Sequence, residues 1–306
     1  MSRTNFNDLL DAGVHFGHLK RKWNPNMAPY IFMERNGIHI IDLYKTAAKI
    51  EEAASAIKQI ARSGKRILFV ATKKQAKEIV ANHVKHIGMP YVTERWPGGM
   101  LTNFATIRKA VRKMASIDKM IATNTYKNLS KRERLQIQRE RAKLEKQLGS
   151  IADLNRLPSA IFVVDILKEH IAVAEAKKLN IPTFAIVDTN SDPTKVDFPI
   201  PANDDASKSI DLIVGVMVKA IEEGMIERKL DKDKRDTEEK EEGDELIKVS
   251  AESVELAEEE EDAEIEKGKK PARPRIKPGV IPPVGEEGTD AGKKVKKPVA
   301  RSGRSR

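Results

Sequence analysis

Short runs of apolar residues that alternate with amphipathic helix patterns constrain the fold of this chain more than any other feature. Four runs are apolar at nearly every position, as is typical of strands covered on both faces. They span residues 66–71, 159–164, 183–187 and, more weakly, 37–41. A fifth run, residues 90–93, is shorter. Buried strands that alternate with helices predict an α/β fold with a doubly wound parallel sheet and right-handed crossovers.

Helix patterns fill the segments between these runs. Asp42 can cap a helix that extends to about Ser63, where Gly64 is placed to end it. Further helices are expected at residues 74–86, 169–179 and 206–223. Gly224 follows the last of these, and we expect it to end that helix.

One crossover, between Trp96 and Leu157, is too long for this plan and contains two helix patterns. The first has its apolar stripe at Phe104, Ile107, Val111, Met114, Ile117 and Ile121. The second has a looser stripe at Leu135, Ala142, Leu144, Leu148 and Ile151. Ser130-Lys-Arg-Glu133 has the form of a capping box, which starts the second helix. We therefore expect a protruding antiparallel coiled-coil hairpin, inserted at about 104–152.

Charge is distributed very unevenly along the chain. Residues 1–230 carry 38 Lys and Arg against 25 Asp and Glu, a net charge of +13. Residues 231–266 have a net charge of −13 from 5 basic and 18 acidic side chains, and residues 267–306 have +10 from 13 and 3. A basic body indicates a partner rich in phosphate, either nucleic acid or an anionic membrane surface.

Composition also changes at Asp231. Beyond it there are no aromatic residues, and Glu, Lys, Pro and Gly dominate. Such a segment cannot bury enough apolar surface to offset the entropy of ordering it. The sequence therefore predicts one α/β domain over residues 1–230 and a disordered tail over 231–306, acidic at 231–266 and basic and Pro-rich at 267–306.

Several functional classes lack their sequence signals. The chain has no cysteine, which excludes a disulfide framework and a cysteine nucleophile. It has no glycine-rich dinucleotide or phosphate loop, and Gly64-Lys-Arg66 precedes a strand instead of opening a helix. The N-terminus has no apolar signal region, and the longest apolar run, Leu212–Val218, is too short to span a bilayer. We expect a cytoplasmic protein that is no enzyme and has no cofactor, small-molecule substrate or membrane anchor.

A metal site remains an alternative. His15, His18 and His39 could combine with an aspartate at a strand end. The candidate aspartates are Asp165, Asp188 and Asp192. A structural role is the commoner one for each type: a histidine can pack against Phe16 or contact phosphate, and an aspartate can cap a helix or turn.

Basic and aromatic residues gather in two segments, near Lys20 and near Arg95. Lysine and arginine pair with phosphates, and tryptophan offers a stacking face to exposed bases. In the second segment, Pro-Gly-Gly at 97–99 makes a turn after which Thr102 or Asn103 can cap the cationic helix. The candidate RNA contacts are Lys20, Arg21, Lys22, Trp23, Asn24, Arg35, Arg95, Trp96, Gly98, Gly99, Asn103, Arg108, Lys109 and Arg112. Replacing Gly98 by valine is expected to misdirect the hairpin.

Three ordered motifs resemble the bacterial ribosomal protein S-two family. They are Leu9-Leu-Asp-Ala-Gly-Val-His-Phe-Gly-His18 with Lys22-Trp-Asn-Pro-Asn-Met27, then Trp96-Pro-Gly-Gly-Met-Leu-Thr-Asn103, then Pro158-Ser-Ala-Ile-Phe-Val-Val-Asp165 continuing to Asn180-Ile-Pro182. The resemblance covers residues 1 to about 228. It implies a flavodoxin-like domain and a structural, rRNA-binding role near the head–body junction of the small ribosomal subunit. It also implies neighbouring small-subunit proteins as partners, including the mRNA-capturing ribosomal protein one.

Two functions of other classes stay open at this point. A doubly wound sheet could carry a nucleotide-dependent enzyme, with Asp165 and Asp188 as strand-end carboxylates. A basic hairpin could instead bind an anionic membrane surface, although its apolar residues are expected to hold the two helices together.

Overall fold

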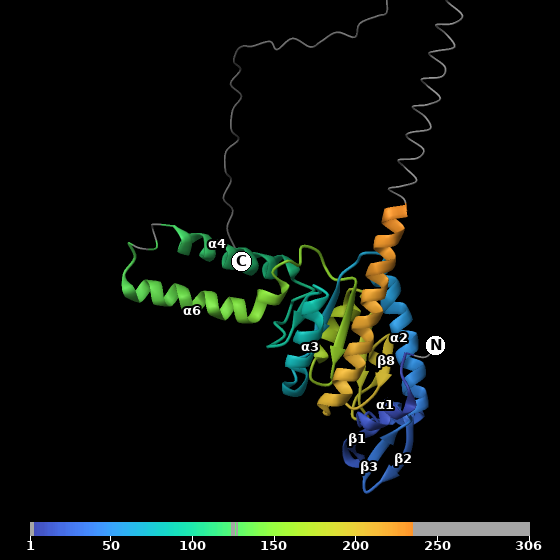
Figure 1. The fold of residues 1–306 in the computed structure, drawn as a ribbon. Coiled ribbons are helices and arrows are strands. Elements are labelled where there is room, and N and C mark those ends of the chain that lie inside the picture. Colours follow the sequence, from blue (N-terminus) through green and yellow to red (C-terminus); the bar gives the residue numbers. More distant parts are fainter. Residues whose placement is uncertain (1–2, 124–125, 127, 235–306) are drawn as a thin grey trace, which may run out of the picture. The chain divides into compact units, whose positions relative to one another are not determined.

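The computed structural model describes residues 3–123, 126 and 128–234 (Figure 1). The described residues belong to one compact unit. Of the tail predicted over residues 231–306, residues 231–234 are helical, and the part from residue 235 onward lies outside the described part of the chain. Within that part, no helix combines the length and the hydropathy that crossing a membrane requires.

A five-stranded parallel sheet forms the centre of the domain. Its strands, in spatial order, are β5 (Tyr91–Val92), β4 (Ile67–Val70), β6 (Ala160–Val164), β7 (Thr183–Val187) and β8 (Phe198–Pro201). Numbered by their place in the chain, these strands have the order 2-1-3-4-5 of flavodoxin-like folds. The parallel sheet expected from the apolar runs is therefore confirmed.

Strand β8 has no counterpart among the predicted strands. Its sequence, Phe-Pro-Ile-Pro, contains two prolines, which cannot donate hydrogen bonds to a neighbouring strand. The strand is tolerated because it lies at the edge of the sheet and pairs with β7 alone.

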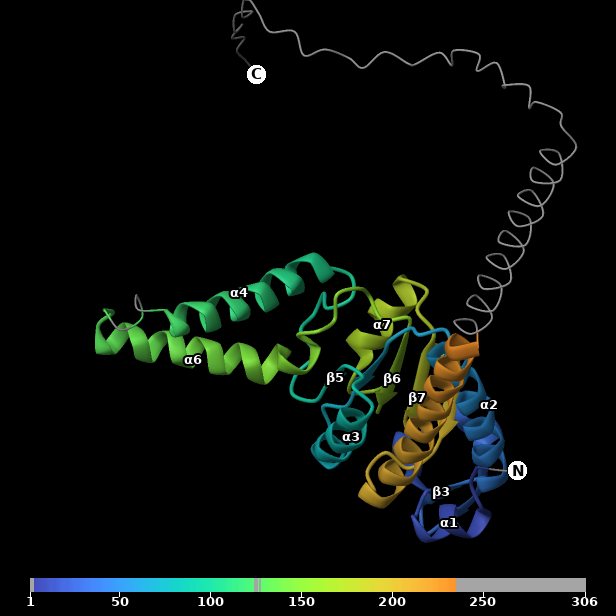
Figure 2. The ribbon, with the colours of Figure 1, turned by 45° about the horizontal axis from the view of Figure 1, so that its top comes forward.

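Both faces of the sheet are covered, so alternate residues of each central strand enter different cores. One face packs against α2 (Leu43–Arg62), α3 (Lys74–His86) and the helix of residues 207–234. The opposite face packs against α7 (His170–Lys178) and the segment around Trp96. Phe69, Phe162 and Phe184 lie in the first core and are fully buried. Figure 2 shows helices on both sides of the strands.

The helix that was expected to end at Gly224 continues through it to at least residue 234. A Cβ on Gly224 would lie 2.5 Å from the carbonyl oxygen of Lys58 and 3.0 Å from the Cβ of Ala61. This glycine therefore permits close contact between the helix and α2. Its role is in packing, and the prediction of a helix stop there was wrong.

The run 37–41 was predicted to join the parallel sheet, and the structure corrects this. It forms β3 (Ile38–Ile41), the central strand of a separate antiparallel sheet with β1 (Phe16–Leu19) and β2 (Ile31–Arg35). Asn36 and Gly37 both have positive φ, and they make the two-residue turn between β2 and β3. Asn-Gly favours this hairpin turn, so a local signal for the antiparallel pair was present in the sequence.

Short elements complete the N-terminal region. Helix α1 (Phe6–Asp11) precedes β1, and the 3-10 turns η1 (Lys20–Lys22) and η2 (Pro25–Tyr30) connect β1 to β2. The Phe6 ring stacks on Tyr44 of α2 at a centroid distance of 5.1 Å. This contact joins α1 to the α/β domain.

In the described part of the long crossover, helix α4 (Phe104–Ala122) and helix α6 (Lys131–Leu148) are followed by η3 (Gly149–Ile151). They lie side by side and run in opposite directions (Figures 1 and 2). The capping box between Ser130 and Glu133 is confirmed. Ion pairs link Lys113 to Glu140 and Asp118 to Arg141 across the two helices.

The inward stripe of α6 differs from the predicted one. Leu135 is 48% exposed and Ala142 is also exposed. The less exposed positions follow steps of three and four residues: Arg134, Ile137, Arg141, Leu144 and Leu148. Leu144, Leu148 and Ile151 of the predicted stripe are confirmed, whereas Leu135 and Ala142 are wrong, because two arginines occupy the inward positions in the first part of the helix.

Candidate nucleic-acid interface

The first candidate segment, residues 20–24, lies beside the carboxyl end of β7; residues 20–23 are exposed and Asn24 is partly exposed. Arg21 and Lys22 have no ion pair with any described carboxylate, while Lys20 pairs with Glu34 at 2.7 Å. Asn24 is fixed at its backbone, because its N–H donates to the carbonyl of Thr189 at 2.8 Å. The segment therefore presents cations from an anchored backbone.

Trp23 and Asn24 have defined roles in this segment. The Trp23 ring lies beside His39 at a centroid distance of 5.2 Å and is 36% exposed, which leaves it partly open to a partner. The Asn24 carboxamide oxygen accepts from the Asn26 N–H at 2.9 Å and caps η2.

The second segment is a turn wrapped around one carboxylate, that of Glu175 on α7. Oε1 accepts from the Gly99 N–H at 2.7 Å and from the Trp96 indole N–H at 3.2 Å. Oε2 accepts from the N–H groups of Leu101 at 2.9 Å and Thr102 at 3.1 Å, and from the Thr102 hydroxyl at 3.2 Å. This carboxylate satisfies the donors just before α4.

The electrostatics of Glu175 follow from these bonds. Its side chain is nearly buried, and burial by itself disfavours the charged form. Hydrogen bonds from Thr102, Gly99, Trp96 and Leu101 outweigh burial and hold the pKa of Glu175 below its ordinary value. The capping role expected of Asn103 is not found, since its side chain makes no cap hydrogen bond.

Trp96 therefore has a different position from the one its sequence neighbourhood suggested. It is 6% exposed and packs in the core that covers the second face of the sheet. A buried ring has no free face for base stacking, so Trp96 positions the turn from inside. Arg95 and Asn103, on either side, are exposed.

The two glycines of the turn are not equivalent. Gly99 has φ of +85°, and an added Cβ would approach Asn103 Cβ to 3.3 Å. Gly98 has no positive φ, and nothing lies within 4 Å of a Cβ built there. The expectation that Gly98→Val misdirects the hairpin is therefore not supported by the geometry, and Gly99 is the position that needs glycine.

We predict that Gly99→Ala lowers the free energy of unfolding by about 1–3 kcal/mol, because an L-residue is strained at positive φ. Gly98→Ala is the matched control and should change it by less than about 0.5 kcal/mol. Urea unfolding of the two variants measures both values. Equal losses would show that backbone conformation at Gly99 is not the cause.

Helix α4 carries the third group of candidate cations. Lys109 and Arg112 are exposed, Arg108 is partly exposed, and none of the three has a described carboxylate within ion-pair distance. Arg108 and Arg112 are four residues apart and so share one face of the helix. The cations that are paired, Lys113 and Arg141, face the other helix of the pair.

Packing brings the first two segments to one side of the sheet. Met27, which follows residues 20–24, belongs to the same buried cluster as Trp96, Met100 and Leu101. Arg35 lies elsewhere, at the end of β2 beside the Asn36-Gly37 turn.

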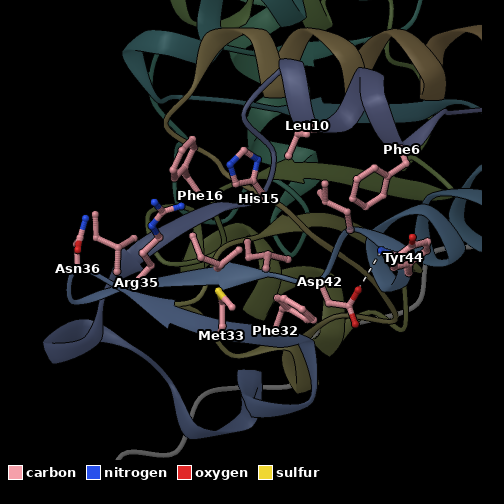
Figure 3. A pocket seen from close by; sticks show the side chains of 14 residues that line it. Phe6, Leu10, His15, Phe16, Phe32, Met33, Arg35, Asn36, Asp42 and Tyr44 are labelled. Carbon is pink, nitrogen blue, oxygen red and sulfur yellow. Dashed lines mark hydrogen bonds between the residues drawn. The ribbon is translucent and has the colours of Figure 1, made fainter.

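Arg35 lines an apolar pocket of about 570 Å³ between α1 and the three-stranded sheet (Figure 3). Aromatic and aliphatic side chains dominate its walls, and Phe32 and Tyr44 are 68% and 76% exposed. An exposed apolar surface of this kind is typical of a protein-binding site.

Acidic groups gather at the carboxyl ends of three strands of the parallel sheet. Asp165 follows β6, Asp188 follows β7, and Asp204 follows β8. Lys73, after β4, lies 2.8 Å from Asp204 Oδ1 and 3.6 Å from Asp165 Oδ2. His18 Nδ1 lies 2.8 Å from Asp188 Oδ2.

These contacts shift two pKa values. The hydrogen bond to Asp188 raises the pKa of His18, although burial opposes the shift. Burial, reinforced by the charges of Asp188 and Asp165, raises the pKa of Asp204 to about 7 even though Lys73 lies beside it.

The metal alternative narrows to one group of side chains. Among the described residues, His18, Asp188 and Asp204 could hold a metal ion, since their candidate ligand atoms all lie within 4.8 Å of one another. Asp204 is fully buried, and its Oδ2 makes no hydrogen bond to any described residue. One imidazole and two carboxylates form a mixed nitrogen and oxygen set of the kind that suits a zinc-type ion.

The other metal candidates have structural roles. The His15 ring packs on Phe16 at a centroid distance of 4.0 Å, and His39 is buried next to Trp23. Asp192 caps η4 (Pro193–Lys195), as turn chemistry predicted. Asp165 accepts from the N–H of Lys168 at 3.1 Å and so caps the turn before α7. Asp204 was not among the sequence candidates; the Asn-Asp-Asp run before the last helix is a signal that could have identified it.

The carboxyl ends of the strands are also where a nucleotide-dependent enzyme with this fold would bind its ligand. Lys73 and Asp165 lie close together at the reversal of strand order between β4 and β6, where such folds bind ligands. The Glu169 carboxylate beside them accepts from the N–H of Thr72 at 3.1 Å. At the other end of the sheet, Gly64 has φ of +75° and follows the end of α2, as predicted. It leads into a strand and not into a helix, so it forms no phosphate-binding loop.

Comparison with known proteins accounts for this combination of motifs and fold. A family model described as ribosomal protein S2 matches residues 9–224. The protein of Phocaeicola vulgatus called small ribosomal subunit protein uS2 is 72% identical over 232 residues, which are 76% of this chain and 83% of that protein. The proteins of the same name from Porphyromonas gingivalis and Bacteroides thetaiotaomicron are each 71% identical over 232 residues, again 76% of this chain, and 83% and 84% of their own lengths. The chain belongs to the ribosomal protein S2 family.

Proposed function

We propose that this protein is a structural component of the small ribosomal subunit that binds its RNA and has no catalytic step. The observation that carries this proposal is a set of exposed cations without carboxylate partners among the described residues, held on anchored backbone in a chain of the ribosomal protein S2 family. Cations of this kind pair with phosphate oxygens and fix the register of a protein on folded RNA.

The anchored turn gives the proposal a mechanism. Glu175 joins α7 to the residues that start α4, so the sheet domain and the helix pair keep a set relative direction. We propose that α4 and α6 act as a coiled-coil hairpin whose outer cations contact RNA while the sheet domain binds a second RNA surface. Arg95, Gly98, Gly99 and Asn103 would then approach RNA as part of the turn, with Trp96 supporting them from the core.

Protein partners fit a different surface. The apolar pocket beside α1 exposes Phe16, Phe32, Met33 and Tyr44, which are suited to apolar side chains and not to phosphate. We propose it as the surface on which neighbouring small-subunit proteins dock, ribosomal protein one included. We also propose that the protein lies near the head–body junction of the small subunit. The division into a domain of residues 1–230 and a tail is part of the same proposal.

The most direct test is sedimentation of a cell lysate through a sucrose gradient. Tagged full-length protein should accumulate in the small-subunit fraction, and a chain truncated after Leu230 should do the same. Absence of the full-length chain from that fraction would overturn the proposal. Loss of the truncated chain alone would assign the tail a role in assembly.

A charge-neutralising variant tests the electrostatic part. Changing Arg108, Lys109 and Arg112 together to glutamine should weaken binding to small-subunit RNA by about 10- to 100-fold at moderate salt. The slope of log affinity against log salt should fall by about 2–3, because each lost phosphate contact releases about one counterion fewer. Filter binding over a salt series measures both quantities.

The matched control removes the same charge from paired positions. Lys45, Lys49 and Lys58 lie on α2, and each forms an ion pair with a neighbouring carboxylate. Their replacement by glutamine should leave affinity and salt slope nearly unchanged. Similar losses in both triple variants would mean that net charge, and not this surface, determines binding. Binding of anionic vesicles without preference for RNA would support the membrane-surface alternative instead.

A further inference from the structure

A small pocket at the amino-terminal ends of the strands of the parallel sheet is lined by three cationic side chains. It has a volume of about 220 Å³, and Lys65, Arg66 and Arg228 form part of its wall. Its other lining residues are apolar or glycine, and none is acidic. Lys65 and Arg66 directly precede β4. The pocket therefore lies at the amino-terminal ends of the strands, whereas residues 20–24 lie at the carboxyl-terminal ends.

Side chains do not neutralise the three cations. No described carboxylate lies within ion-pair distance of any of them, and all three are exposed. The acidic residues next to Arg228 in the same helix have other partners. Glu227 pairs with Lys58 at 2.7 Å, and Asp231 pairs with Arg62 at 2.8 Å.

Two helix ends offset only part of this charge. Helices α2 and α3 both end at the pocket, where Gly64 and Gly88 follow them and form part of its wall. The carboxyl end of a helix carries about half a negative charge, so two ends offset about one of the three positive charges. The pocket therefore stays electropositive and attracts an anion.

Packing and backbone contacts anchor the chain segments that carry the three cations. A Cβ on Gly64 would lie 2.2 Å from Cζ of Arg228, so the guanidinium lies against the glycine backbone more closely than any other residue would permit. Gly64 thereby links the last helix to the segment before β4. In that segment, the Arg66 carbonyl accepts from the Ser159 N–H at 2.9 Å. The cations thus come from two anchored segments that lie far apart in the chain.

We propose that Lys65, Arg66 and Arg228 bind one phosphodiester group of an RNA backbone. This site rests on the proposed RNA-binding function and adds to it a contact at the amino-terminal ends of the parallel strands. A guanidinium can donate two parallel hydrogen bonds to phosphate oxygens, and an ammonium contributes a point charge. A pocket of this size holds one phosphate group, so it contacts the RNA backbone and does not read base sequence.

The test is a full-length variant in which Lys65, Arg66 and Arg228 are all replaced by glutamine. Its affinity for small-subunit RNA should fall by about tenfold at moderate salt, and its salt slope by about 1, because one phosphate contact is lost. None of the three side chains has an ion pair with a described carboxylate, and Arg228 loses only its packing against Gly64, so the free energy of unfolding should change by less than about 0.5 kcal/mol. The variant with Lys45, Lys49 and Lys58 changed to glutamine is the matched control and should bind RNA normally.

Acetylation of lysines, followed by mass spectrometry, locates the contact in the unmodified chain. RNA at ten times its Kd should slow acetylation of Lys65 by about tenfold and leave that of Lys49 unchanged. Unprotected Lys65 together with normal RNA affinity of the triple variant would overturn this inference. The proposed function would still stand if the α4 variant lost affinity in the same assay. Protection of Lys65 by vesicles of phosphatidylglycerol but not by RNA would also overturn the inference.

Discussion

Glu175→Ala is expected to lower the free energy of unfolding by about 3–5 kcal/mol. The change leaves the N–H groups of Gly99, Leu101 and Thr102 and the indole N–H of Trp96 without their acceptor. Each unsatisfied buried donor costs about 1–3 kcal/mol, and water entering the space left by the side chain recovers part of that. Urea unfolding followed by circular dichroism measures the loss.

The turn should also lose its function. We expect the direction of α4 relative to the sheet to become variable, so incorporation of Glu175→Ala into small subunits should fall more than its stability alone explains. Glu140→Ala is the control, since Glu140 is an exposed partner of Lys113 and its loss should cost less than about 1 kcal/mol. Equal effects of the two substitutions would contradict the role given to Glu175.

The pH dependence of this contribution has a defined sign. The pKa of Glu175 is lower in the folded state than in the unfolded chain, so the folded state binds this proton less strongly. The stabilisation is therefore fully present above the unfolded pKa of about 4.3 and is lost as pH falls through the folded value. Glu175→Gln should show a shallower loss of stability below that pH than the unmodified chain.

Lys73→Met is expected to lower the free energy of unfolding by about 3 kcal/mol. Lys73 lies 2.8 Å from Asp204 and 2.6 Å from Asp205, with Asp165 at 3.6 Å. Burial lowers the pKa of Lys73, but the bonds to Asp204 and Asp205 outweigh it and the net shift is upward. Removing one partner of a buried ion pair leaves uncompensated charge, which usually costs about 3–5 kcal/mol. Since Asp205 is half-exposed, we expect the lower end.

The measurement is thermal unfolding of chelator-treated protein at pH 8. The chelator ensures that no metal ion contributes to the stability of the protein. Lys49→Met is the matched control, because Lys49 pairs with Glu52 three residues away on an exposed helix face. Such pairs contribute about 0.5 kcal/mol or less. A loss for Lys73→Met no larger than that for Lys49→Met would show that the acidic group does not depend on this lysine.

Local signals in the sequence were sufficient for most of the α/β domain. Asp42 and Gly64 mark the two ends of α2, and the capping box at Ser130 marks the start of α6. The central strands were identifiable because a strand covered on both faces must be apolar at successive positions. These features depend on residues close together in the chain, so the sequence alone could specify them.

Features that depend on a distant partner were missed or assigned wrongly. Gly224 reads as a helix stop until the carbonyl of Lys58 is seen 2.5 Å from where a Cβ would be. The inward face of α6 contains Arg141 because Asp118 on α4 pairs with it. Strand β8 tolerates prolines because only one of its edges is paired.

The candidate site divides in the same way. The sequence alone identified the cations at Lys20–Lys22 and on α4, and the glycine turn between the sheet and the helices. It also revealed the likeness to a ribosomal protein family. Composition and ordered motifs are local properties, so they can be read without the structure. Tertiary structure decided that Trp96 is buried, that Glu175 from α7 caps the turn, and that Gly99 is the constrained glycine. It also brought Arg228 against Gly64. Such contacts between distant parts of the chain follow from the packing of strands and helices, and no local pattern contains that information.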